Sequence, residues 1–118
     1  MIQDSEMKDN LLSLLELSLG KEIMGYMHDK DIIEIMKNGD GKVFADSLTK
    51  GEFYIGNMDS IAAENVVKLV ANHVNQEVTS ENPIVSAELP GSGFRFEGNI
   101  PPITETSVFN IRKHSSLI

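Results

Sequence analysis

Residues 84–113 read IVSAELPGSGFRFEGNIPPITETSVFNIRK, which is the pattern of a β region. Three short segments, at 84–89, 94–99 and 108–113, have the alternation of strands. Between them stand Pro90-Gly91-Ser92-Gly93 and Pro101-Pro102, residue types that favour turns. The stretch therefore predicts three consecutive strands of one antiparallel sheet.

Alternation also assigns side chains to faces, because successive side chains of a strand point to opposite sides of the sheet. The apolar members, which we expect inside, are Phe94, Phe96, Phe109 and Ile111. Arg95 and Arg112 then share the outer face, because a slip by one residue would bury them. A guanidinium can bind phosphate or carboxylate oxygens through two parallel hydrogen bonds. The pair is therefore either an anion clamp or two ordinary surface arginines.

Helical periodicity occurs in three other segments. It predicts helices over 11–19, 21–28 and 61–76. Asp9 or Asn10 would cap the first helix and Gly20 would end it, whereas Asp59 or Ser60 would cap the third. The residues expected to face the core are Leu11, Leu12, Leu15, Leu19, Ala62, Val66, Leu69, Val70 and Val74.

Three further strands are predicted upstream, at 31–37, 42–46 and 52–55. Asn38-Gly39-Asp40-Gly41 supplies hairpin turn residues between the first two. Strands arranged in hairpins, with separate helices, are typical of the α+β class, in which helices cover an antiparallel sheet.

Composition places the chain among ordinary soluble single domains. It has 118 residues, no cysteine and a net charge of −8. No apolar run is long enough to cross a membrane, and no signal peptide is evident, so a cytoplasmic location is expected. Residues 1–82 contain fifteen acids and seven lysines, which accounts for the whole −8. Such an anionic chain repels a phosphate backbone, so we expect no direct nucleic-acid binding.

Common site motifs are absent. Both Gly-Lys pairs, at 20–21 and 41–42, lack the first glycine and the following Ser or Thr of a phosphate loop. Gly91-Ser92-Gly93 lacks the third glycine of a dinucleotide fingerprint, and 36–47 lacks the acidic end residues of a calcium loop. The histidines, far apart in sequence, are His28, His73 and His114. We therefore expect no metal site and no enzymatic activity from this chain alone.

Residues 82–114 resemble the N-terminal domain of the conjugative-transfer ATPases of type IV secretion, the TrbB-like traffic ATPases. The shared pattern falls on Pro83-Ile84, on 88–98, on Pro101-Pro102 and on 109–113. A weaker likeness extends the resemblance to residues 19–118, and residues 1–18 show no likeness to a family that we can name.

The resemblance implies a PAS-like antiparallel sheet with flanking helices over 19–118. We expect residues 1–18 to form an N-terminal helical extension. A C-terminal RecA-like ATPase domain would follow, so the chain is expected to be a truncated piece of a longer protein. In the family, six subunits form stacked rings at the cytoplasmic face of the inner membrane, beside other secretion-complex proteins. ATP and Mg²⁺ belong to the full-length protein, and the piece alone is expected to hold no cofactor.

The resemblance also implies roles for individual residues. Arg95 and Arg112 match the segments whose arginines reach the phosphates of ATP bound between the two domains. Glu97 would support one guanidinium, and Lys113 is a further phosphate candidate. The alternative is a free-standing PAS-like module that binds a small molecule or a protein.

Overall fold

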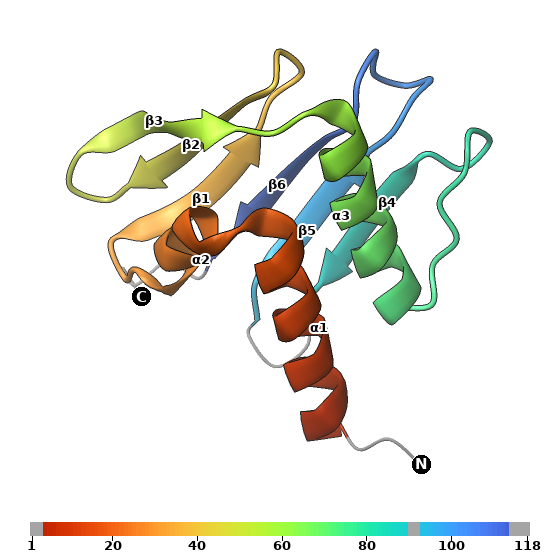
Figure 1. The fold of residues 1–118 in the computed structure, drawn as a ribbon, viewed down its shortest axis with the longest axis horizontal. Coiled ribbons are helices and arrows are strands. Elements are labelled where there is room, and N and C mark those ends of the chain that lie inside the picture. The colour runs from red at the N-terminus through yellow and green to blue at the C-terminus, as the bar shows by residue number, and fades with distance from the viewer. Residues whose placement is uncertain (1–3, 90–92, 114–118) are drawn as a thin grey trace.

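Helices and strands follow one another in the order that the alternation and periodicity predict. The computed structural model describes residues 4–89 and 93–113 (Figure 1). The helices are α1 (Asp4–Leu19), α2 (Lys21–His28) and α3 (Ser60–His73). The strands are β1 (Ile32–Lys37), β2 (Lys42–Ser47), β3 (Gly51–Asn57), β4 (Ile84–Glu88), β5 (Arg95–Asn99) and β6 (Val108–Arg112). The predicted turn residues Pro90, Gly91 and Ser92, and also His114, lie outside the described ranges.

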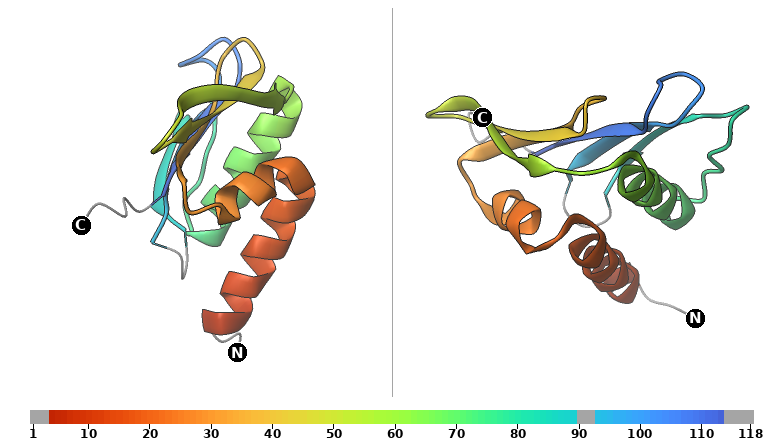
Figure 2. Two further views of the ribbon diagram at one scale, coloured as in Figure 1. Left: turned by 90° about the vertical axis from the view of Figure 1, so that its left-hand side faces the viewer. Right: turned by 45° about the horizontal axis from the view of Figure 1, so that its top comes forward.

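Within those ranges the six strands form a single antiparallel sheet in the order β3-β2-β1-β6-β5-β4. The first three strands and the last three are each joined in sequence, and β1 pairs with β6 at the centre. The described helices all lie on one side of the sheet (Figure 2). The α+β class and the antiparallel sheet with flanking helices are confirmed, and the opposite face of the sheet is free of helices in the described part of the chain.

The core lies between the helices and the inner face of the sheet. From the sheet it takes the side chains that alternate inward, including Ile35, Val43, Ala45, Val85, Phe96, Phe109 and Ile111. Leu11, Leu15 and Leu19 of α1 belong to the same buried cluster, and α1 packs against α3. Gly98 of β5 allows α3 to lie close to the sheet, because a Cβ there would come within 2.7 Å of Val67 Cγ2.

One local prediction about the helices is wrong and another is incomplete. The first helix begins at Asp4, so Asp9 and Asn10 lie inside it and do not cap it. On α3 the predicted Val66 and Val70 are fully buried, and the predicted Ala62, Leu69 and Val74 are partly buried and pack against the core. The prediction missed Ala63, Val67 and Ala71, which are also fully buried. The buried face is wider than predicted because α3 packs against α1 as well as the sheet. The predicted cap of α3 is confirmed, since the Asp59 side chain accepts a hydrogen bond from Ala62 N.

None of the helices in the described residues is long and apolar enough to cross a membrane.

Candidate functional site

The two arginines lie directly opposite each other on neighbouring strands. Arg95 of β5 is the cross-strand partner of Arg112 of β6, and Phe96 is the partner of Ile111. Phe96 and Ile111 are buried, whereas both arginines are exposed on the face away from the helices. The predicted shared face is thus confirmed. Alternation requires only that the two arginines share a face, whereas the register makes them direct cross-strand neighbours.

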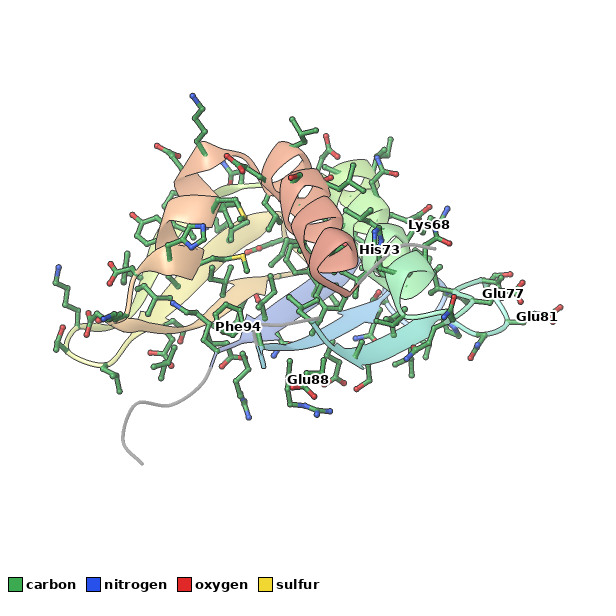
Figure 3. The ribbon with its side chains drawn as sticks, turned by 90° about the horizontal axis from the view of Figure 1, so that it is seen from below. Lys68, His73, Glu77, Glu81, Glu88 and Phe94 are labelled. Carbon is green, nitrogen blue, oxygen red and sulfur yellow. The ribbon has the colours of Figure 1, made fainter. Side chains whose placement is uncertain are left out.

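The register places a row of charged residues across the whole sheet. From edge to edge the successive cross-strand partners are Glu88, Arg95, Arg112, Glu34, Asp46 and Glu52. Figure 3 shows Glu88 on the side of the sheet away from the helices. Like charges directly opposite each other destabilise a sheet, so the Arg95–Arg112 pair opposes folding unless other groups offset its repulsion.

A hollow of about 110 Å³ lies beside the arginine pair. The residues that line it, here called the arginine hollow, are Ser86, Arg95, Phe96, Glu97, Asn110 and Arg112. A second hollow, of about 380 Å³, adjoins it and shares Glu97 and Asn110. The uncovered face therefore offers two guanidinium groups, a hydroxyl, an amide and a carboxylate around one depression.

The contacts of the two arginines differ. Arg112 Nη2 lies 3.7 Å from Glu34 Oε1, with the Arg112 side chain 70% exposed and that of Glu34 15% exposed. Arg95 has no ion-pair partner among the described residues, and neither has Glu97. The carboxylate that contacts a guanidinium is therefore that of Glu34. The supporting role expected of Glu97 stays a prediction.

Glu34 and Asn110 are functional candidates that the sequence pattern did not reveal. Asn110 Nδ2 donates a hydrogen bond to Glu34 Oε2 over 2.6 Å. The signal that could have found them is the register between β1 and β6, which makes Glu34 the neighbour of Arg112. That register joins residues 76 positions apart in the chain.

Lys113 lies apart from the arginine hollow. Its Nζ donates to the backbone carbonyls of Tyr26 and Asp29 at the end of α2, and it lies 5.8 Å from the centroid of the Phe94 ring. A cation at the C-terminus of a helix is favourable. Burial lowers the pKa of Lys113, and Asp29 opposes that effect. The structure thus brings Arg95, Arg112 and Glu97 together but places Lys113 on the helix side of the sheet.

A fully buried cation, Lys37, lies at the C-terminal end of β1. Its Nζ donates to the backbone oxygen of Ser107 over 2.6 Å, and burial lowers its pKa against the opposing charges of Asp40 and Asp59. His73 lies on α3, where its Nδ1 is 3.0 Å from the backbone oxygen of Leu69. Among the described residues no three histidine or acidic side chains gather closely enough to hold a metal ion.

Two curated proteins are similar to most of this chain. A probable conjugal transfer protein TrbB of Sinorhizobium fredii (strain NBRC 101917 / NGR234) is 42% identical over 106 residues, which is 90% of this chain and 33% of that protein. The conjugal transfer protein TrbB of Rhizobium radiobacter is 41% identical over 106 residues, with the same coverage. This chain is homologous to the N-terminal third of TrbB. It therefore spans about a third of the length of the TrbB relatives, and no family model matches it.

A solved structure shows the same fold. It is the crystal structure of the VirB11 ATPase from the Brucella suis type IV secretion system in complex with sulphate. The match has a TM-score of 0.75 and 24% sequence identity, and it covers 94% of this chain and 33% of the VirB11 chain. This match shows that the chain and part of the VirB11 chain share one fold, an antiparallel sheet of six strands with helices.

Proposed function

We propose that this chain is the N-terminal domain of a hexameric ATPase that powers type IV secretion or conjugal transfer, and that Arg95 and Arg112 contact phosphates of ATP. Residues 19–118 would form the domain and residues 1–18 a helical extension. The ATP and its Mg²⁺ would be bound by a RecA-like domain outside this chain. The homology to TrbB and the fold shared with a VirB11 ATPase support this proposal.

The observation that carries the phosphate contact is the pairing of Arg95 with Arg112 beside a hollow on an uncovered face. Two adjacent guanidinium groups repel each other, and an anion between them would remove that repulsion. Most donors of the pair are free for such an anion, because the one ion pair that either arginine makes among the described residues is a single contact of 3.7 Å from Arg112 to Glu34. Phosphate oxygens suit this arrangement because guanidinium donors match them two at a time.

The arginine face would work as one half of a composite site. Positive charge placed on transferring phosphates stabilises the charge that develops in phosphoryl transfer. Because the arginines and the phosphates would sit on different domains, closure of the domains would assemble the site and hydrolysis would release it. The remaining partners would be neighbouring subunits of the ring and secretion-complex proteins at the cytoplasmic face of the inner membrane.

The test is ATP turnover by the full-length protein with Arg95→Ala or Arg112→Ala. Each variant should lower turnover, by as much as about 10³-fold if the arginine contacts the transferring phosphate and by less if it only binds or positions the nucleotide. The free energy of unfolding of each variant should stay within about 0.5 kcal/mol of that of the unchanged protein, because both side chains lie outside the core. Arginine to lysine at either position should restore only part of the rate, since an ammonium cannot make the paired contact.

Lys42→Ala is the matched control, because it removes one exposed positive charge from the same sheet, on β2. Its turnover should equal that of the unchanged protein. Full turnover in both arginine variants would refute the phosphate contact. A large loss of stability in either would show that the arginines support the fold instead.

A further inference from the structure

Glu34 joins two residues of the arginine hollow without lining it. One of its carboxylate oxygens accepts a hydrogen bond from Asn110 over 2.6 Å, and the other lies 3.7 Å from Arg112 Nη2. The two contacted residues lie on β6, two positions apart, whereas Glu34 lies on β1. Asn110 on β6 therefore fixes one oxygen of the Glu34 carboxylate, and the other oxygen faces the guanidinium of Arg112.

The contact with Glu34 matters because Arg112 has little else to fix it. Its side chain is 70% exposed, and its neighbour on β5 is another arginine that repels it. A long exposed side chain under such repulsion moves into solvent, where ordering it again costs conformational entropy. A fixed carboxylate on its other side keeps the guanidinium close to the sheet while leaving its other donors free.

We infer that Glu34 is a positioning residue that holds Arg112 ready for a phosphate group, an inference that rests on the proposed phosphate contact of the arginine pair. Asn110 fixes the Glu34 carboxylate, and Glu34 in turn fixes the guanidinium. The ligand chemistry is a chain of phosphates carrying several negative charges. Arg95 has no such support among the described residues and completes the clamp from β5.

The row of charges supplies a matched control. Glu88 is the cross-strand neighbour of Arg95, as Glu34 is of Arg112, so each carboxylate flanks the arginine pair from one side. No ion pair joins Glu88 to either arginine in the described residues. Removal of either negative charge should strengthen phosphate binding if only the net charge counts. Removal of Glu34 should weaken it if the carboxylate positions Arg112.

The experiment titrates inorganic tripolyphosphate into this chain and follows the Nε–Hε signals of both arginines by NMR. Glu34→Gln should raise the Kd about two- to fivefold, the range for an exposed ion pair. Glu88→Gln should leave the Kd unchanged or lower it. Without ligand, Glu34→Gln should increase the fast motion of the Arg112 Nε–Hε group and leave that of Arg95 unchanged. Glu34→Asp should restore part of both effects and serves if Glu34→Gln folds poorly.

A double-mutant cycle distinguishes the positioning role of Glu34 from the phosphate contact of the arginine pair. Glu34→Gln should not raise the Kd when Arg112 is already alanine, because only the loss of a negative charge then counts, but it should still raise the Kd when Arg95 is alanine. An equal or lower Kd for Glu34→Gln, with a raised Kd for Arg112→Ala, would overturn the positioning role and leave the phosphate contact standing. An unchanged Kd in both arginine variants would refute the phosphate contact and the inference with it.

Discussion

A single methyl group added at Gly98 tests how closely α3 lies on the sheet. An ideal Cβ there would lie 2.7 Å from Val67 Cγ2, 3.1 Å from Val67 Cγ1 and 2.9 Å from Phe96 Cε1. Carbon atoms in optimal contact are about 3.5–4.0 Å apart, so the overlap amounts to about 1 Å. Val67 and Phe96 are both buried, and neither can turn into solvent. Gly98→Ala should therefore force α3 and β5 apart.

Overpacking of this kind costs about 1–3 kcal/mol. For a domain of this size each kcal/mol corresponds to roughly 4 °C in Tm, so Gly98→Ala should melt about 4–12 °C lower. Thermal unfolding followed by far-UV circular dichroism measures the shift. The double variant with Val67→Ala, which removes both clashing valine methyls, should be less destabilised than the sum of the single variants by about 1 kcal/mol.

Gly25→Ala is the control for the substitution itself. Gly25 lies inside α2, is exposed and has nothing within 4 Å of its ideal Cβ. Alanine is about 0.5–1 kcal/mol more favourable than glycine in a helix, so this variant should melt higher. If Gly98→Ala melts within a degree of the unchanged protein, or if the two changes at Gly98 and Val67 are additive, the close contact of α3 with β5 is not what limits this position.

Three further outcomes are expected. Asp59→Ala removes the hydrogen bond to Ala62 N and should cost about 1 kcal/mol in urea unfolding, whereas Asp59→Asn should retain most of it. Burial lowers the pKa of Lys37 below 10.5, so the folded state loses this proton before the unfolded chain does. The free energy of unfolding should therefore rise as the pH increases from the folded-state pKa towards 10.5, and Lys37→Met should diminish that rise; the opposite slope would contradict the burial effect. Finally, the chain alone should hydrolyse no ATP, and turnover that persists through successive purification steps would contradict this expectation.

The shared face of Arg95 and Arg112 was predictable because alternation along a strand is a local property. Burial of Phe96, Phe109 and Ile111 is enough to turn both arginines outward, whatever the exact pairing of the two strands. The contacts around the arginines were not predictable in this way. Glu34 meets Arg112 only because β1 pairs with β6, and no local pattern states which distant strands become neighbours.

The buried face of α3 likewise could not be predicted in full from the local sequence pattern. Its periodicity predicts an amphipathic helix, but Ala63, Val67 and Ala71 are fully buried in addition to Val66 and Val70. The difference arises because α1 packs against α3 while the sheet lies beneath it, so the helix buries a wider face than one partner requires. Alanine and valine side chains are small enough for the contacts with α1 and with the sheet. A hydrophobicity pattern alone does not show that Ala63, Val67 and Ala71 are buried rather than exposed.

The amino-acid sequence was sufficient for the order of the helices and strands, the inward faces of β5 and β6 and the lack of a phosphate loop, because propensity and periodicity act over a few residues. The strand order β3-β2-β1-β6-β5-β4, the charged row across the sheet and the hold of Glu34 on Arg112 and Asn110 arise from long-range pairing. Such pairing joins residues more than 70 positions apart and depends on how the helices bury the inner face of the whole sheet. The position of both arginines on one face therefore follows from the local sequence of β5 and β6, whereas their contact with a carboxylate of β1 follows from the tertiary fold.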